Sequence, residues 1–315
     1  MTLPPTPFTR IVDCRLPLQQ AGMGGVTTPA LAAAVAAEGG LGMVAAAGLT
    51  SDQVCAQVAA ALELAGNDAR VGVNFLVPFL DDQALEAASQ VAALVECFYG
   101  DPDAAIVERV HGGGALAAWQ VGSRDEARAA VDAGCDVIVA QGVEAGGHVR
   151  GTSPLLPLLE EVRGATRVPL VAAGGVGTGA AMAEVLLAGA DAVRVGTRFV
   201  ATSEADVHPA YRDALLASGA GDTVLAEAFS MGWPHAPHRV LRQCVDASTL
   251  EPAMRSPLPP TRAFDGEVAS AALYAGESVG AVTGVLPAAA VVRELIRDAE
   301  AVLQRAAVGR REHGG

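Results

Sequence analysis

The segment from Gln141 to His148, which reads QGVEAGGH, brings an amide, a carboxylate, an imidazole and three glycines into one short stretch. A histidine flanked by glycines in a loop is not a typical core histidine. Because an imidazole has an unperturbed pKa of about 6.5, it can take a proton from a carbon acid near neutral pH. We predict that His148 is a general base; the alternative is a structural or phosphate-contacting histidine.

Two glycine-containing turns could bind a phosphate group. One runs from Ala173 to Gly179 (AGGVGTG) and opens a predicted helix, and the other runs from Arg194 to Thr197 (RVGT). A phosphate needs converging backbone N–H groups, which Cβ atoms would obstruct, and a helix N-terminus adds favourable partial charge. Such turns also occur simply to reverse the chain, but a pair of them after neighbouring strands favours a phosphate site. A Rossmann fold is disfavoured because its glycine turn normally lies in the first β/α unit.

The elements that must position these turns follow a β/α order. Between residues 16 and 200, short apolar runs alternate with Ala-, Leu-, Glu- and Arg-rich segments of helical period. Continuous apolar runs are typical of parallel strands that are buried on both faces. Eight such strands predict an α/β fold, a (β/α)8 TIM barrel with its site at the carboxyl ends of the strands, and a doubly wound open sheet is the alternative. The predicted strands are Leu16–Met23, Leu41–Ala47, Arg70–Val77, Val95–Gly100, Ala115–Val121, Asp136–Gln141, Val168–Ala173 and Ala192–Gly196.

The chain beyond the predicted barrel has a different pattern. We predict a barrel over residues 1–217 and a C-terminal extension over residues 218–315, which forms a lid and a final helix packed on the barrel. The final helix is expected from Pro287, because apolar residues follow at helical spacing and a basic end suits the helix dipole. His235 and His238 flank prolines in the extension and could belong to the lid or to an ordinary loop. No metal site is expected there, since no carboxylates join them at ligand spacing.

The composition excludes several classes of function. The formal net charge is -14, from 35 acidic and 21 basic residues, and every basic residue is arginine. Without lysine there is no Schiff-base, pyridoxal phosphate or Walker-A chemistry. An acidic surface repels nucleic acid and anionic lipid, so neither is an expected partner. The five cysteines are far apart without a C-x-x-C pair, and no signal peptide or membrane span is evident, so we expect a cytoplasmic protein.

Besides QGVEAGGH, the segments PLQQAGMGG, EGGLGMVAA, VGVNFLVP, AAGGV, RVGTRFV and AGESVGAVTGVLPAA form a set of motifs that extends over most of the chain. With this set the chain resembles the nitronate monooxygenases, formerly called 2-nitropropane dioxygenases. The resemblance implies an FMN-dependent barrel that oxidises alkyl nitronates, and often nitroalkanes, with molecular oxygen to a carbonyl compound and nitrite.

The resemblance also implies roles for individual residues. His148 would be the catalytic base toward a nitroalkane. The implied FMN contacts lie at strand ends and in the glycine turns, at Gly22, Met23, Asn74, Gln141, Gly146, Gly174, Gly175, Arg194, Val195, Gly196 and Thr197. Asn74 could instead be an ordinary strand-end residue. The expected partners are a nitronate or nitroalkane and O2, and the sequence leaves open whether the chain forms a homo-oligomer.

The chain departs from the family pattern in places that bear on the site. The family commonly has Ala-Pro-Met where this chain has Ala-Gly-Met, ending at Met23. It often has Gln in the place of Arg194, where an arginine would add charge near the phosphate. Its His-Arg-Gly motif is one residue longer here, because Val149 follows His148. At the fifth predicted strand, Trp119 could form a wall over the flavin or pack in the core.

Two alternative functions remain open at this stage. The first is an FMN- and NAD(P)H-dependent enzyme similar to enoyl-acyl-carrier-protein reductases, whose loop resembles Glu-Ser-Gly-Gly-His. Ala145 in place of that serine favours a monooxygenase. The second is a biosynthetic accessory barrel that binds a phosphorylated ligand without redox chemistry.

Overall fold

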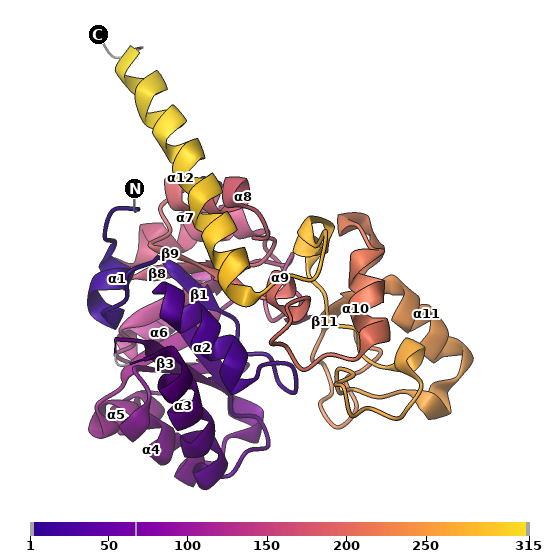
Figure 1. Cartoon of the computed structure of the whole chain (residues 1–315). Coiled ribbons are helices and arrows are strands. Elements are labelled where there is room, and N and C mark those ends of the chain that lie inside the picture. Colours follow the sequence, from indigo (N-terminus) through magenta and orange to yellow (C-terminus); the bar gives the residue numbers. More distant parts are fainter. Residues whose placement is uncertain (1–2, 67, 313–315) are drawn as a thin grey trace.

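The computed structural model describes residues 3–66 and 68–312, and its central element is a closed barrel of parallel strands (Figure 1). The strand order is β1-β2-β3-β4-β5-β6-β8-β9, and β1 pairs with both β2 and β9, which closes the barrel. The predicted TIM barrel is confirmed, and each predicted strand is present with ends that differ by a few residues. The strands are β1 (Leu18–Gln20), β2 (Leu41–Ala45), β3 (Arg70–Leu76), β4 (Leu94–Phe98), β5 (Leu116–Val121), β6 (Val137–Gln141), β8 (Leu170–Ala173) and β9 (Ala192–Val195).

Helices surround the barrel in the usual alternation, except after the last strand. The helices that follow the first seven barrel strands are α2 (Pro29–Glu38), α3 (Ser51–Ala65), α4 (Asp82–Val91), α5 (Ala104–Gly113), α6 (Arg124–Asp132), α7 (Leu155–Ala165) and α8 (Gly179–Leu187). After β9 comes only the short α9 (Thr197–Val200). The place of a full eighth helix is taken by α12 (Ala288–Glu312), which packs against α8 and α2 and extends beyond the barrel (Figure 1). The end of the chain therefore completes the helical ring.

The interior of the barrel is apolar at its amino end and polar toward its carboxyl end. Helix α1 (Pro7–Val12) closes the amino end, where Phe8 packs with Leu41 and Leu94 in one buried cluster. Because side chains alternate along a strand, the inward residue after Leu94 is Glu96. This carboxylate lies among inward-facing amides and an arginine from other strands. A polar layer therefore separates the apolar plug from the carboxyl ends of the strands.

The chain between α9 and α12 forms a smaller body beside the barrel, seen in orange in Figure 1. It contains α10 (Pro209–Leu216), β10 (Thr223–Ala226), β11 (His238–Leu241) and α11 (Arg242–Leu250). Strands β10 and β11 form an antiparallel sheet with β7 (Gly147–His148), which belongs to the loop after β6. The sheet thus joins residues from both sides of position 217, and the division of the chain at that position stays a prediction.

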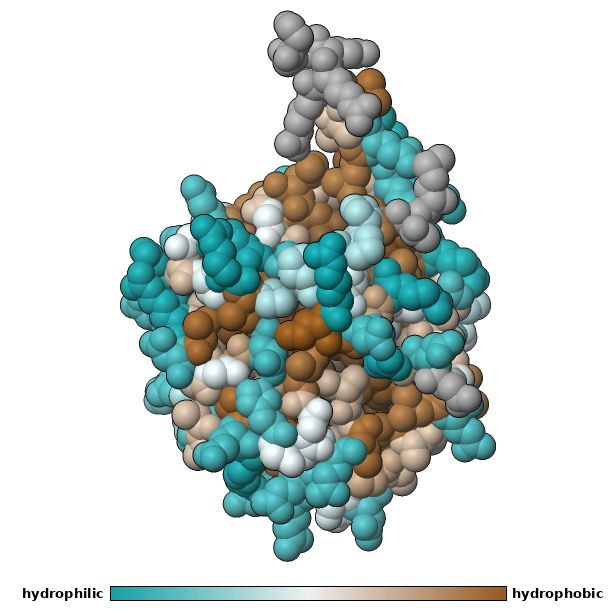
Figure 2. Space-filling model, turned by 90° about the vertical axis from the view of Figure 1, so that its left-hand side faces the viewer, coloured by the Kyte–Doolittle hydropathy of each residue, from teal (hydrophilic) through white to brown (hydrophobic). Residues whose placement is uncertain are grey.

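The surface of the barrel side is mixed in character. Figure 2 shows hydrophilic side chains scattered among apolar ones on this face. Within residues 3–66 and 68–312, no helix is both long and apolar enough to cross a bilayer.

Candidate active site

A cavity of about 350 Å³ opens at the carboxyl ends of the barrel strands. It brings together nearly all of the residues that the sequence predicts for the site: Gly22, Met23, Asn74, Gln141, Gly146, His148, Gly174, Gly175, Arg194, Gly196 and Thr197. Val195 is the exception, because it alternates with the inward-facing Arg194 and is fully buried outside the cavity lining. The structure therefore does not place the side chain of Val195 in the site.

The cavity floor, which we define as Asn74, Gln120, Gln141 and Arg194, consists of polar side chains carried by barrel strands. The amide nitrogen Nδ2 of Asn74 donates a hydrogen bond of 2.7 Å to Oε1 of Glu96. Gln120 accepts a hydrogen bond from the Arg194 guanidinium. Trp119, by contrast, is buried against the helices and donates its indole N–H to the carbonyl of Gly100, so its role is core packing.

Arg194 is held by an ion pair beneath the floor. Its guanidinium contacts the carboxylate of Glu96, which is fully buried, and its Nε donates to Oε1 of Gln19 at 3.4 Å. Burial lowers the pKa of Arg194 to about 9, which still leaves the side chain protonated at neutral pH. Its charge is therefore paired with Glu96 at the floor of the cavity and is not free for a phosphate at the glycine turns, as the sequence had suggested.

Gln141 connects the floor to the loop that carries His148. Its Nε2 donates a hydrogen bond of 2.8 Å to the backbone carbonyl of His148. Its Oε1 is buried and has no hydrogen-bond partner within the described protein. An unpaired buried acceptor is costly, so a ligand that donates a hydrogen bond in the cavity would suit this atom.

Glycines allow the loops to approach one another around the cavity. A Cβ on Gly146 would lie 2.4 Å from the backbone nitrogen of Gly276, in the segment after β11. Gly174 and Gly175 have φ values of 112° and 70°, which side-chain-bearing residues rarely adopt. Both glycines line the cavity, so the backbone before α8 borders it directly. Thr197 completes this side, since its hydroxyl accepts the N–H of Gly276 at 3.0 Å.

His148 lies opposite the floor and is positioned by the small antiparallel sheet. Within this sheet His148 is in register with His238 of β11. The next residue, Val149, is fully buried and its N–H donates to the carbonyl of Pro237 at 2.9 Å. The extra residue relative to the family pattern thus extends the pairing with the β11 side.

Aromatic rings enclose the His148 imidazole. Trp233 is the nearest, with ring centroids 4.3 Å apart and planes inclined by 31°, and Tyr99 and Tyr274 follow at 5.9 and 5.8 Å. Burial, with a smaller contribution from His238, lowers the pKa of His148 to about 3. The imidazole is therefore neutral at physiological pH.

His238 has a structural role in this arrangement. The N–H of Phe229 donates to its Nε2 at 3.2 Å, so the ring proton lies on Nδ1, which is 3.1 Å from the carbonyl of Ala236. Burial lowers the pKa of His238, which keeps it neutral. His235 is exposed and lies outside the cavity lining. No group of three or more potential metal ligands occurs within residues 3–66 and 68–312.

Glu144, the carboxylate of the predicted catalytic segment, serves a different purpose. Both of its oxygens accept the backbone N–H of Leu155, at 3.0 and 3.1 Å, at the start of α7. An acidic group at a helix N-terminus is stabilising. Glu144 therefore fixes the loop to α7 and does not line the cavity.

Some residues of the site escaped the sequence analysis. Glu96 carries a detectable signal, because it is an acid within the otherwise apolar strand LVECF. Tyr274 carries none, since it comes from an irregular segment far along the chain. Trp233 lies in the possible lid segment with His235 and His238, and Ser278 lies in the AGESVGAVTGVLPAA motif, but the sequence did not mark either as a site residue. Ser278 lines the cavity near the glycine turns, where a Cβ on Gly177 would lie 2.8 Å from its own Cβ.

Comparison with known proteins gives the family. The chain matches the family model described as nitronate monooxygenase over residues 6–93 and 68–298. It is 30% identical over 272 residues to a probable nitronate monooxygenase of Staphylococcus aureus. The alignment covers 71% of this chain and 75% of that protein. It is also 33% identical over 240 residues to the (3aS,4S,5R,7aS)-5-hydroxy-7a-methyl-1-oxo-octahydro-1H-indene-4-carboxyl-CoA dehydrogenase of Mycobacterium tuberculosis, with 75% of this chain and 66% of that protein covered.

Solved structures agree with this result. FabK from Thermotoga maritima superposes with a TM-score of 0.84 at 25% identity, covering 96% of this chain and 99% of that one. A nitroalkane oxidase from Streptomyces ansochromogenes gives a TM-score of 0.80 at 29% identity, covering 96% and 100%.

Fold, cavity and relatives together define a flavin-dependent oxidoreductase on a TIM barrel. Within that class, the chain belongs to the nitronate monooxygenase family. The predicted resemblance is thereby confirmed.

Proposed function

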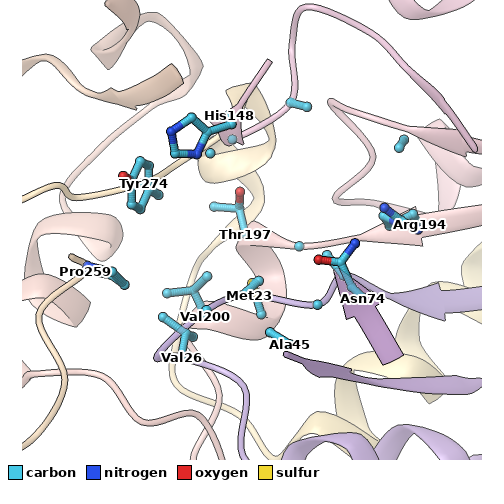
Figure 3. A pocket seen from close by; sticks show the side chains of 18 of the residues that line it. Met23, Val26, Ala45, Asn74, His148, Arg194, Thr197, Val200, Pro259 and Tyr274 are labelled. Atoms are coloured by element: carbon cyan, nitrogen blue, oxygen red, sulfur yellow. The ribbon is translucent and has the colours of Figure 1, made fainter. Parts of the chain in front are cut away.

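We propose that the protein uses FMN to oxidise alkyl nitronates and nitroalkanes with molecular oxygen, giving a carbonyl compound and nitrite. The observation that carries this proposal is the arrangement in Figure 3, where His148 faces Asn74 and Arg194 across one cavity. A substrate between them would meet a neutral imidazole on one side and polar side chains on the other. Membership of the nitronate monooxygenase family supports the same reaction.

The residues around the cavity suit FMN. Bound FMN would supply a two-electron acceptor that can pass its electrons to oxygen. The unpaired Oε1 of Gln141 would accept a hydrogen bond from it. The cavity-lining backbone at Gly174 and Gly175, between β8 and α8, and at Gly196, before α9, would bind the phosphate.

His148 is suited to remove a proton from the α-carbon of a nitroalkane. A base must be unprotonated before the reaction, and burial keeps the pKa of His148 low enough for that at any pH near neutrality. Proton transfer would create an imidazolium beside an anionic nitronate. Because opposite charges attract strongly in a poorly solvated cavity, the pair would raise the proton affinity of His148 as the transfer proceeds.

A second candidate is NAD(P)H-dependent chemistry on an unsaturated acyl thioester. The Mycobacterium tuberculosis relative is named for a carboxyl-CoA substrate, and FabK has the same overall structure. The cavity wall formed by Val26, Val200 and Pro259 is apolar and would accept a hydrocarbon chain.

The two candidates differ in what reduces the flavin. FMN is added to the purified protein, excess cofactor is removed, and the visible flavin absorption is followed under anaerobic conditions after mixing with propyl-2-nitronate or with NADH. Bleaching by the nitronate and not by NADH is the result expected for our proposal. Bleaching by NADH alone would favour the second candidate. Failure of the protein to retain FMN would refute both.

A further inference from the structure

The cavity lining carries a charged side chain, Arg194, that has no role in the proposed reaction. Among the described residues that line the cavity, Arg194 is the only Arg, Asp or Glu. Its partner Glu96 is fully buried and does not line the cavity. The ion pair is therefore oriented, with its positive member toward the ligand space and its negative member below.

The pair spans the barrel. Glu96 lies on β4 and Arg194 on β9, strands that stand opposite each other in the closed order β1-β2-β3-β4-β5-β6-β8-β9. Side chains from further strands hold the carboxylate: Oε1 accepts Nδ2 of Asn74 at 2.7 Å, and Oε2 accepts Nε2 of Gln19 at 3.2 Å. Gln120 holds the guanidinium from β5. The network fixes both charged groups from several directions.

Stability alone does not account for such a pair. Desolvation of two buried charges commonly offsets their attraction, so that apolar or neutral residues in their place are often as stable. An oriented, fully enclosed pair beside a ligand cavity therefore suggests an action on the ligand.

We propose that Arg194, positioned by Glu96, stabilises negative charge on the ring system bound in the cavity and so favours the reduced over the oxidised flavin. This inference rests on the proposed use of FMN. A flavin that accepts two electrons and one proton gains one negative charge. A fixed cation in a site of low dielectric interacts strongly with that charge, and charges near the flavin ring are a principal means by which proteins tune its reduction. Glu96 is a positioning residue, since it contacts Arg194 and not the cavity.

The test uses a neutral network in place of the charged one. In the double variant Glu96→Gln/Arg194→Gln neither charge is left unpaired, which avoids the folding defect expected of either single change. Affinities for oxidised FMN come from fluorescence titration, and reduction potentials of the bound flavin come from equilibration with a reference dye. The expected result is that the ratio of affinities for reduced and oxidised FMN falls at least about tenfold, which is about 30 mV for a two-electron couple.

A matched control separates this effect from the loss of any enclosed ion pair. Arg163 and Asp191 form a partly buried pair, at 2.5 Å, and neither residue lines the cavity. The variant Arg163→Gln/Asp191→Asn should leave the affinity ratio unchanged. An unchanged ratio in the Glu96/Arg194 variant, or an equal fall in the control, would overturn the inference while leaving the proposed function intact. If the wild-type protein bound no FMN, both would fall.

Discussion

The floor and the roof of the cavity are built in opposite ways. The floor consists of polar side chains that project from barrel strands and are held by hydrogen bonds and an ion pair. The roof, which we define as His148, Pro259 and Tyr274 together with Trp233, whose ring contacts His148, consists of rings on loops and on the edge of a small sheet. The rings of Trp233 and Tyr274 both contact the imidazole of His148. The single polar link between the two regions is the hydrogen bond from Gln141 to the His148 carbonyl, among those that the structure describes.

This difference assigns separate tasks to the two regions. Side chains on the strands of a closed barrel have fixed positions and suit a permanent partner such as a cofactor. The roof residues come from segments after β6 and after β9, so their positions depend on the docking of the smaller body on the barrel. We expect changes in the floor to affect stability and the flavin, and changes in the roof to affect turnover.

The largest effect is expected in the floor, from Glu96→Gln alone. This change leaves the buried Arg194 charge without its counterion, which typically costs about 3–5 kcal/mol of unfolding free energy. Urea denaturation measures the loss. The control Asp82→Asn breaks an exposed pair with Arg109 and should cost no more than about 1 kcal/mol. Equal losses in the two variants would show that the floor pair is not specially enclosed.

In the roof, His148→Asn should reduce kcat for neutral nitroalkanes by about 10²-fold or more, equivalent to about 2.7 kcal/mol, because the base is lost. FMN should stay bound, and a nitronate prepared beforehand should be oxidised with a smaller loss. Steady-state oxygen consumption with both substrates gives the comparison. His235→Asn, at an exposed position, serves as control. Unchanged nitroalkane turnover in His148→Asn would refute its role as base.

Gly146→Ala tests the junction between the two regions. The added methyl group would meet the backbone of Gly276 and Ala275, which cannot move aside as a flexible side chain can. Overpacking of this kind costs about 1–3 kcal/mol, and we expect weaker FMN binding by titration. Gly112→Ala, which meets no atom within 4 Å and lies in α5, should not weaken binding.

Replacement of Trp233 by leucine should have a more modest effect on the roof. The variant loses the ring contact with His148, and aromatic contacts contribute about 0.5–1.5 kcal/mol beyond their buried area. We expect kcat/KM for nitroalkanes to fall by the factor that corresponds to this free energy, with little change in FMN affinity. Phe79→Leu is the control, because Phe79 contacts Trp233 without a described ring contact to His148. A larger loss in the control would argue against a direct effect of Trp233 on the base.

The smallest expected effect on turnover is that of pH. Since the pKa of His148 is about 3, kcat/KM for a nitroalkane should not fall as the pH is lowered through about 6.5, the usual histidine value. Stability, unlike turnover, should respond to pH in this range. His148 takes up a proton at about pH 6.5 in the unfolded chain but only at about pH 3 in the folded protein, so its contribution to stability is complete above about 6.5 and declines as the pH falls toward 3. A pH–rate profile and acid titrations of the wild type and His148→Asn provide the measurements. An acidic limb near 6.5 would contradict a buried, neutral base.

The barrel, and the strand ends and glycine turns that border its cavity, follow from local patterns in the sequence. Its apolar runs recur at the spacing of β/α units, and its glycine turns follow the strands at whose carboxyl ends a barrel site lies. Both signals are local, which is why Gly174, Gly175 and the Gln141 to His148 segment could be recognised. For Val195 a contact with the cofactor stays a prediction, because its side chain is buried outside the cavity lining.

The meeting of charged and aromatic side chains depends on long-range packing. Glu96 and Arg194 are 98 positions apart, and nothing in either strand specifies the other as its partner. His148 receives its place and its neutral state from β11, Trp233 and Tyr274, which come from the smaller body. Burial and pairing arise from closure of the barrel and docking of that body, and both are long-range events that leave no periodic trace in the sequence.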